Sequence, residues 1–214
     1  WVFVPGHADA VSGLFRIEGI PGNVAIFQSF PVAPVIGTIL EPGQGFDPAS
    51  GSILNVVMPG GLTVTSDGAL AGALAGGWQL GVGYAVTPII RAGDPLLVSG
   101  ILNNPSIRAV HINAIKMAVV QDGYTGVVID YGTLEQLDRE NFTVFITELT
   151  AALHAYNKLV IVRPVTPIGV TGGFESGGYD WRALGAVADG IIVDPGYGSG
   201  VMESYAYTSS MIGW

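Results

Sequence analysis

The chain has 214 residues, of which 49% are hydrophobic, 12% are charged and none is cysteine, and its formal net charge is −9. The absence of cysteine excludes disulfides and thiolate metal sites. No basic run that could neutralise phosphates is present, so neither nucleic acid nor an anionic membrane surface is an expected partner.

The low share of charged residues is about half the usual ~25%, which leaves two interpretations. The chain is either a compact, loop-rich domain or a subunit whose surface is partly covered by neighbouring domains or copies. Apolar runs such as LGVGYAVTPII are far shorter than the ~20 residues of a spanning helix, so no membrane span is expected. An acidic chain without cysteine suits an exported protein, which predicts a location outside the cell or at its surface.

Glycine and proline punctuate residues 1–34 around two short strand-like pieces, WVFVP and NVAIF. This composition predicts an N-terminal lead-in or the end of a preceding module. The main domain is therefore expected over residues 35–214.

Short apolar runs that predict buried strands follow in chain order. A hairpin with its turn at SDG comes after the second run, and the six runs cover residues 35–40, 53–58, 79–90, 126–130, 158–163 and 190–194.

Helices are expected between these runs. Two segments, split at NNP, lie between residues 94 and 124, with Pro105 in the first turn of the second. The clearest helix covers residues 138–156, where apolar residues recur at helical spacing, and a short one covers residues 179–189. Continuously apolar strands that alternate with helices predict parallel β/α packing, with an active site at the carboxyl ends of the strands. No glycine-rich nucleotide motif follows a strand, so no cofactor is expected.

Several of these segments, in the same order, resemble the barrel of glycoside hydrolase family 18, especially its bacterial cell-wall and spore-associated branch. They are ILNVVMPGGLTVTSDGAL, SGILNNPSIRAVHINAIKMAVVQDGYTGVVIDYGTLEQLDRENFTVFITELTAALHAYNKLVIVRP and YDWRALGAVADGIIVDPGYGSG. The resemblance covers roughly residues 35–200 and implies an α/β fold, a (β/α)8 TIM-barrel-like domain. Only about six of its eight strands are recognisable, so the barrel is expected to be incomplete in this chain, with its last strands missing.

The catalytic motif of that family is Asp-Gly-x-Asp-x-Asp-x-Glu along the fourth strand, with the Glu as general acid. The last Asp orients the N-acetyl group of the substrate, which acts as the nucleophile. Aligned with this motif, Thr125 and Val128 replace two aspartates, Asp130 is retained, and Gly132 stands at the glutamate. Glycine cannot donate a proton, so the resemblance implies a scaffold that has lost this chemistry.

A second departure lies at the sixth strand, where the sequence reads Asp194-Pro195-Gly196-Tyr197. The family's tyrosine, which helps to hold the acetamido group, corresponds to Gly196. Two losses at two strand ends favour a real change of function over an isolated substitution.

Other carboxylates are candidates for a substitute acid, namely Glu135 after the fourth strand, Glu175 in the GGFESGG loop and Asp194. Asp130 with Asp194 would make the pair of carboxylates that glycosidases use. The alternatives are that Glu135 and Asp138 cap the following helix, that Glu175 is merely solvated, and that Asp130 is structural, bonded to backbone or tyrosine groups.

The candidate glycan-binding residues are Asp130, Tyr131, Tyr197 and Glu175, since both tyrosines stand at strand ends where a ring could stack on a sugar. The three histidines do not show metal-ligand spacing, so no metal site is expected. We expect His111 in the core or at an interface, and His154 near the end of a helix, where it interacts with the helix dipole.

Three functions remain open. The first is a non-catalytic glycosidase-like module outside the cell, with a structural role or binding a polysaccharide such as peptidoglycan or a chitin-like polymer. The second is an active hydrolase of N-acetylglucosamine-containing polymers that uses a substitute acid. The third is a self-assembling surface or filament subunit, a homo-oligomer or larger assembly, which the low charge content and the open barrel favour.

Overall fold

The computed structural model describes residues 2–5, 37–44, 46, 54–171 and 173–193. The predicted strands form two sheets, in which they lie parallel to one another and follow the order of the apolar runs in the sequence. The smaller sheet has the order β2 (Gly37–Leu40), β3 (Val56–Pro59) and β6 (Ala85–Val86). The larger has the order β1 (Val2–Pro5), β12 (Gly190–Val193), β9 (Leu159–Val162), β8 (Gly126–Asp130), β7 (Ile89–Arg91), β4 (Leu62–Val64) and β5 (Leu70–Gly72).

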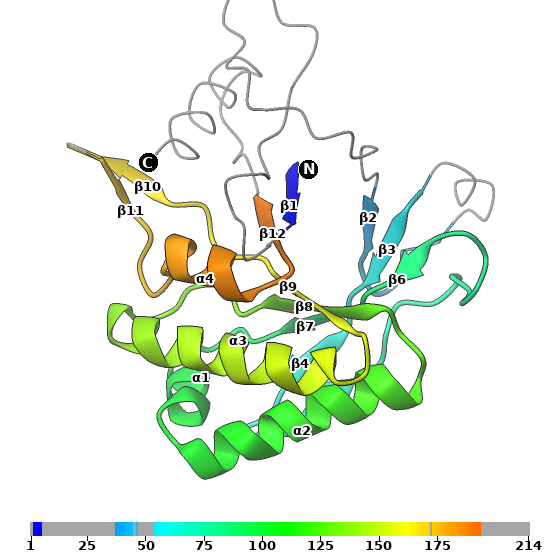
Figure 1. Cartoon of the computed structure of the whole chain (residues 1–214), viewed down its shortest axis with the longest axis horizontal. Helices are drawn as coiled ribbons and strands as arrows, with labels where there is room; N and C mark the ends of the chain where they lie inside the picture. The colour runs from blue at the N-terminus through cyan, green and yellow to red at the C-terminus, as the bar shows by residue number, and fades with distance from the viewer. Residues whose placement is uncertain (1, 6–36, 45, 47–53, 172, 194–214) are drawn as a thin grey trace, which may run out of the picture.

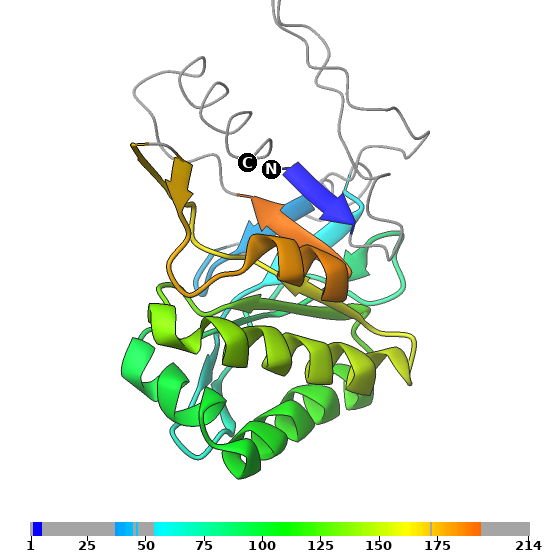
Figure 2. The same ribbon diagram turned by 60° about the vertical axis from the view of Figure 1, so that its left-hand side comes forward.

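The two sheets are joined by the chain itself. β3 runs through a Gly60–Gly61 bend into β4, and β6 runs through Pro88 into β7. Counting each joined pair once gives six parallel strand positions among the described residues, so the six predicted strands and the α/β fold class are confirmed. β1 lies antiparallel beside β12 (Figures 1 and 2).

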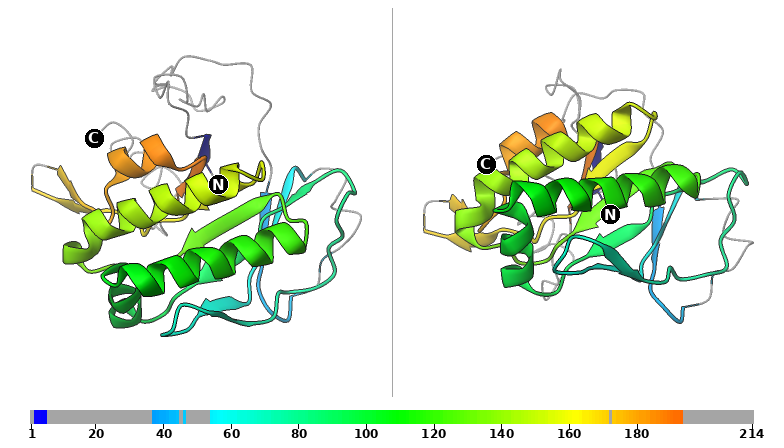
Figure 3. Two further views of the ribbon diagram at one scale, coloured as in Figure 1. Left: turned by 60° about the horizontal axis from the view of Figure 1, so that its bottom comes forward. Right: turned by 90° about the horizontal axis from the view of Figure 1, so that it is seen from below.

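The helices cover one face of the larger sheet (Figure 3). They are α1 (Pro95–Leu102), α2 (Pro105–Gln121), α3 (Arg139–His154), preceded by the short η2 (Gln136–Asp138), and α4 (Trp181–Val187). α1 and α2 separate at the predicted place, because Asn104 caps the amides of Ser106 and Ile107 and Pro105 occupies the first turn. Among the described residues, none of the helices combines the length and hydropathy that a membrane crossing requires.

The predicted cap of α3 is wrong. Glu135 and Asp138 stand at the N-cap positions of η2 and α3, but neither side chain bonds a helix amide. The buried carboxylate of Asp138 instead accepts hydrogen bonds from Ser99 and from Asn103 Nδ2, the latter at 2.7 Å. It therefore ties α1 to the start of α3.

A second correction concerns the segment after β9, which was expected to be a loop. It forms a two-stranded hairpin of β10 (Ile168–Val170) and β11 (Gly173–Glu175). Strands of three residues in a glycine-rich segment are too short to show the alternation that identifies a strand in sequence.

Alternate residues of each strand face two different apolar clusters. The larger cluster fills the space between the sheet and the helices. A smaller one occupies the opposite, concave face and takes buried residues from successive strand positions, namely Met58, Ile89, Val128, Ile161 and Ile192, with Ile39 packed against them. This cluster corresponds to an interior layer of a barrel. Because successive side chains of a strand point to opposite faces, the residues two positions further along each strand form the next layer on this face.

Candidate functional site

The layer above the interior cluster is charged. A step of two residues toward the carboxyl ends of the strands leads from Ile39, Met58, Ile89, Val128 and Ile161 to five further residues on the same face. These residues are Glu41, Gly60, Arg91, Asp130 and Arg163. Arg91 and Asp130 are direct register partners of β7 and β8.

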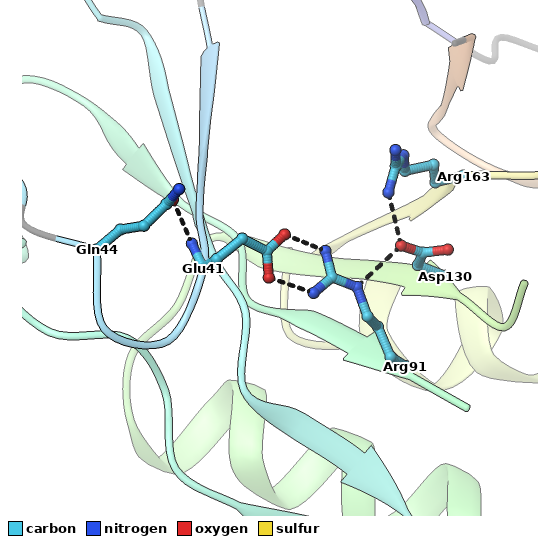
Figure 4. Close-up of polar contacts among 5 residues, drawn as sticks. All are labelled: Glu41, Gln44, Arg91, Asp130 and Arg163. Atoms are coloured by element: carbon cyan, nitrogen blue, oxygen red, sulfur yellow. Dashed lines mark hydrogen bonds and ion pairs between the residues drawn. The ribbon is translucent and has the colours of Figure 1, made fainter. Parts of the chain in front are cut away.

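The four charged residues of this layer form a continuous chain of ion pairs, here termed the charged belt (Glu41, Arg91, Asp130 and Arg163; Figure 4). Arg91 Nη1 and Nη2 donate to the two carboxylate oxygens of Glu41 at 2.6 and 2.7 Å. Arg91 Nε donates to Asp130 Oδ2 at 3.1 Å, and Arg163 Nη1 donates to the same oxygen at 2.8 Å. Asp130 is therefore bonded to two guanidinium groups, and the expectation that it bonds backbone or tyrosine groups is wrong.

Glycine at position 60 makes room for this chain. A Cβ added there would lie 3.2 Å from Arg91 Nη1 and 3.3 Å from Glu41 Oε2. The turn after β2 is also held, since the Glu41 amide donates to the side chain of Gln44 at 2.8 Å. The local sequence thus both leaves space for the Glu41–Arg91 pair and positions Glu41.

Electrostatics within the belt favour the charged forms of both members of this pair. The hydrogen bonds from Arg91 lower the pKa of Glu41, against a smaller opposing effect of burial. The bonds to Glu41 raise the pKa of Arg91, with Asp130 acting in the same direction. Arg91 is 30% exposed and Glu41 43%, so solvent weakens the pair, whereas Asp130 is only 13% exposed.

An open pocket of about 230 Å³ adjoins one end of the belt. It is lined by Asp130, Arg163, Pro164, Val165 and Thr166. The carboxylate accepts hydrogen bonds and the guanidinium donates them, while proline and valine supply apolar surface. Such a lining suits a polar organic ligand that carries both donors and acceptors.

Asp130 is the only one of the predicted site residues that lies in this layer among those the structure describes. Tyr131, the next residue, points to the other side of β8. It is 2% exposed, its hydroxyl bonds to His111, and its ring stacks on Phe145 with centroids 5.8 Å apart. The structure therefore places Tyr131 in the core beneath the helices and not beside the pocket.

The candidate substitute acids are not joined to Asp130. Glu135 and Glu175 are exposed, and no hydrogen bond or ion pair links either of them to it. Asp194, Gly196 and Tyr197 lie outside the described residues. Within the described ranges, no group of three or more potential metal ligands occurs.

Gly132 occupies the turn that follows β8. Its φ is +61°, a left-handed conformation that glycine adopts without strain. Its carbonyl accepts a hydrogen bond from the Tyr179 hydroxyl at 2.5 Å. The chain at this position is thus held in a turn by a buried tyrosine from the segment before α4.

Sequence reasoning missed three of the four residues of the charged belt. Glu41, Arg91 and Arg163 each stand at the carboxyl end of an apolar strand run, as Asp130 does. A single charged residue at the end of these four runs was a usable signal, because parallel strands bring such positions to one edge.

Comparison with known proteins gives one match in sequence. No family model matches the chain. The Bacillus subtilis protein YdhD, which is named as a sporulation-specific glycosylase, is 31% identical over 98 residues. Those residues are 45% of this chain and 23% of YdhD.

Solved structures resemble the chain over more of its length. The spore cortex-lytic enzyme SleL of Bacillus megaterium superposes with a TM-score of 0.67 at 17% identity, over 96% of this chain and 55% of SleL. A chitinase of Chromobacterium violaceum superposes with a TM-score of 0.65 at 20% identity, over 84% of this chain and 65% of the chitinase. The chain spans less than two thirds of each of these proteins. Over the shared part it has the mostly parallel α/β fold of the TIM-barrel chitinases and spore-lytic enzymes.

Proposed function

We propose that the chain is a glycosidase-like module that binds an N-acetylglucosamine-containing polysaccharide, peptidoglycan or a chitin-like polymer, without hydrolysing it. It would act outside the cell or at the cell surface. The fold and the similarity to YdhD support the choice of ligand. The pocket beside Asp130 and Arg163 supports the place, because ligands of parallel β/α folds bind at the carboxyl ends of the strands.

The proposed loss of hydrolysis is supported by the residues at the carboxyl end of β8. The only acidic side chain that β8 brings to the pocket is Asp130, and its Oδ2 is already bonded to Arg91 and Arg163. In the family resemblance the general acid would stand at Gly132, which has no side chain and lies in a left-handed turn. General acid catalysis typically contributes 10²- to 10⁴-fold to the rate.

The test measures binding and turnover on the same protein. Chitin oligosaccharides and purified peptidoglycan fragments are titrated by calorimetry, and the mixtures are then analysed for new reducing ends by mass spectrometry. We expect binding that weakens in Asp130→Ala, with no product. Turnover by the unmodified protein would contradict the proposal. In that case Glu135→Gln, Glu175→Gln and Asp194→Asn would identify the substitute acid.

Self-assembly is a second candidate function, and exposed aliphatic side chains favour it. Leu96, Leu137 and Ile168 are 76%, 93% and 69% exposed, and they belong to the segments that follow β7, β8 and β9. They therefore lie toward the same end of the sheet as the pocket. Sedimentation velocity at rising concentration tests this function, and a single monomeric species throughout would exclude it.

A further inference from the structure

The charged belt contains an indirect connection to the pocket. Asp130 and Arg163 line the pocket, whereas Glu41 does not. Glu41 nevertheless holds two nitrogens of the guanidinium whose third nitrogen holds Asp130. Arg91 is thus the only described residue bonded to both carboxylates of the belt (Figure 4).

The geometry of arginine makes this connection rigid. The guanidinium is planar, so fixing Nη1 and Nη2 on the two oxygens of Glu41 also fixes the direction of the Nε–H bond. That bond points at Asp130 Oδ2. A lysine at position 91 would keep the charge but not this forked geometry.

The rest of the layer supports the same arrangement. Gly60 leaves the space that the Glu41–Arg91 pair fills, with a Cβ there reaching 3.2 Å from Arg91 Nη1. Both bonds to Asp130 converge on Oδ2, and no described residue donates to Oδ1. The carboxylate is therefore held from one side, and its second oxygen remains an acceptor.

We propose that Arg91, oriented by Glu41, is a positioning residue that holds Asp130 as a fixed acceptor for the ligand of the adjoining pocket. This proposal rests on the proposed function for the identity of that ligand. It adds that two residues outside the pocket lining, Glu41 and Arg91, affect the affinity through one carboxylate. Glu41 acts on ligand binding only by way of Arg91 and Asp130.

The affinity test is a double-mutant cycle with a chitin oligosaccharide, measured by calorimetry. We expect Glu41→Gln to weaken binding about tenfold, which corresponds to the loss of one hydrogen bond to a charged group. In the Asp130→Asn background the same change should have no further effect. Arg91→Met should weaken binding as much as Glu41→Gln or more, and Arg91→Lys should fail to restore it.

The matched control is a second forked ion pair on the helix side of the sheet. Arg108 donates to both oxygens of Glu148, at 2.8 and 3.2 Å. Glu148→Gln breaks a pair of the same kind far from the pocket-lining residues, so it should leave the affinity unchanged. An equal loss in Glu148→Gln and Glu41→Gln would overturn the positioning role.

A measurement without ligand separates this proposal from the proposed function. Exchange of the Arg91 Nε proton, followed by NMR, should be slow in the unmodified protein and faster in Glu41→Gln, and it should stay slow in Glu148→Gln. If Glu41→Gln leaves this exchange unchanged, the positioning proposal is wrong whatever binds. If the exchange behaves as expected but no glycan binds, the proposed function fails and the positioning of Asp130 by Arg91 stands.

Discussion

At the scale of single residues, Gly132 shows how the backbone conformation of a turn can decide which residue is favoured at a position. Its φ of +61° lies in the region where side chains are strained. A Cβ added there would meet only the Ala92 carbonyl oxygen, at 3.7 Å, so space is not limiting. Backbone conformation, and not crowding, is therefore what favours glycine at this position.

Gly132→Ala should lower the free energy of unfolding by about 1 kcal/mol, because alanine must adopt a left-handed conformation there. Gly100→Ala is the matched control, since Gly100 lies within α1 with no atom within 4 Å of the added Cβ. It should raise stability by about 0.5–1 kcal/mol through helix propensity. Urea unfolding measures both changes, and equal effects of the two would contradict the conformational explanation.

At the scale of elements, a buried histidine connects three parts of the fold. His111 of α2 is fully buried, and its Nδ1 donates to the Gly68 carbonyl in the β4–β5 turn at 2.8 Å. This assigns the second ring nitrogen as the acceptor for the hydroxyl of Tyr131, the residue after β8. The sequence left a core or an interface position open for His111, and the structure places it in the core, with hydrogen bonds to the turn and to Tyr131 that were not foreseen.

This connection predicts a loss of stability in mild acid. Burial lowers the pKa of His111 below its ordinary value of 6.5, although the bond to Gly68 opposes the shift. The unfolded chain therefore takes up the proton first, so stability is constant above that value and falls as the pH drops below it. The loss should be up to about 1.4 kcal/mol per pH unit.

Unfolding at pH 7.5 and 5.5 measures this effect. His111→Gln should remove most of the difference between the two pH values, whereas His154→Gln should keep it. His154, the last residue of α3, is a suitable comparison because its side chain is 52% exposed and pairs with Asp189. A pH dependence that survives in His111→Gln would rule out the buried ring as its cause.

At the scale of the whole molecule, the charged belt joins strands that are far apart in the chain. Glu41 follows β2 in the smaller sheet, whereas Arg91, Asp130 and Arg163 belong to the larger one. The apolar layer beneath it is continuous over the same strands. The belt therefore lies at one end of this face of the sheets, with charges that neutralise one another in pairs.

The belt should contribute a second, more acidic step to the stability profile. The pKa of Glu41 is lowered in the folded protein by Arg91, so its contribution is present above its ordinary value of 4.5 and is lost as the pH falls through the folded value. The pair is partly exposed, which limits the effect to about 0.5–1 kcal/mol. Unfolding of Glu41→Gln should be less pH-dependent than that of the unmodified protein below pH 4.5, and an unchanged pH dependence in this variant would contradict the role of the pair.

Much of the fold was predictable because its signals are local. Val127, Val128 and Ile129 form a run that is apolar on both faces, which is characteristic of a buried parallel strand. Phe142, Phe145 and Leu149 repeat at the spacing of a helix. The β10–β11 hairpin was missed because its strands are too short to carry such a pattern.

The sequence by itself determined the order of strands and helices, the position of Asp130 at a strand end and the absence of a side chain at Gly132. Only the tertiary structure decided which side chains bond to Asp130. Its partner Arg91 is 39 residues away, and the partner of Arg91, Glu41, is 50 residues further toward the N-terminus. Strand register brings them together, and register depends on the packing of the whole sheet and not on any local pattern. For the same reason Tyr131, adjacent to Asp130 in sequence, lies on the opposite face of β8, since successive side chains of a strand point in opposite directions.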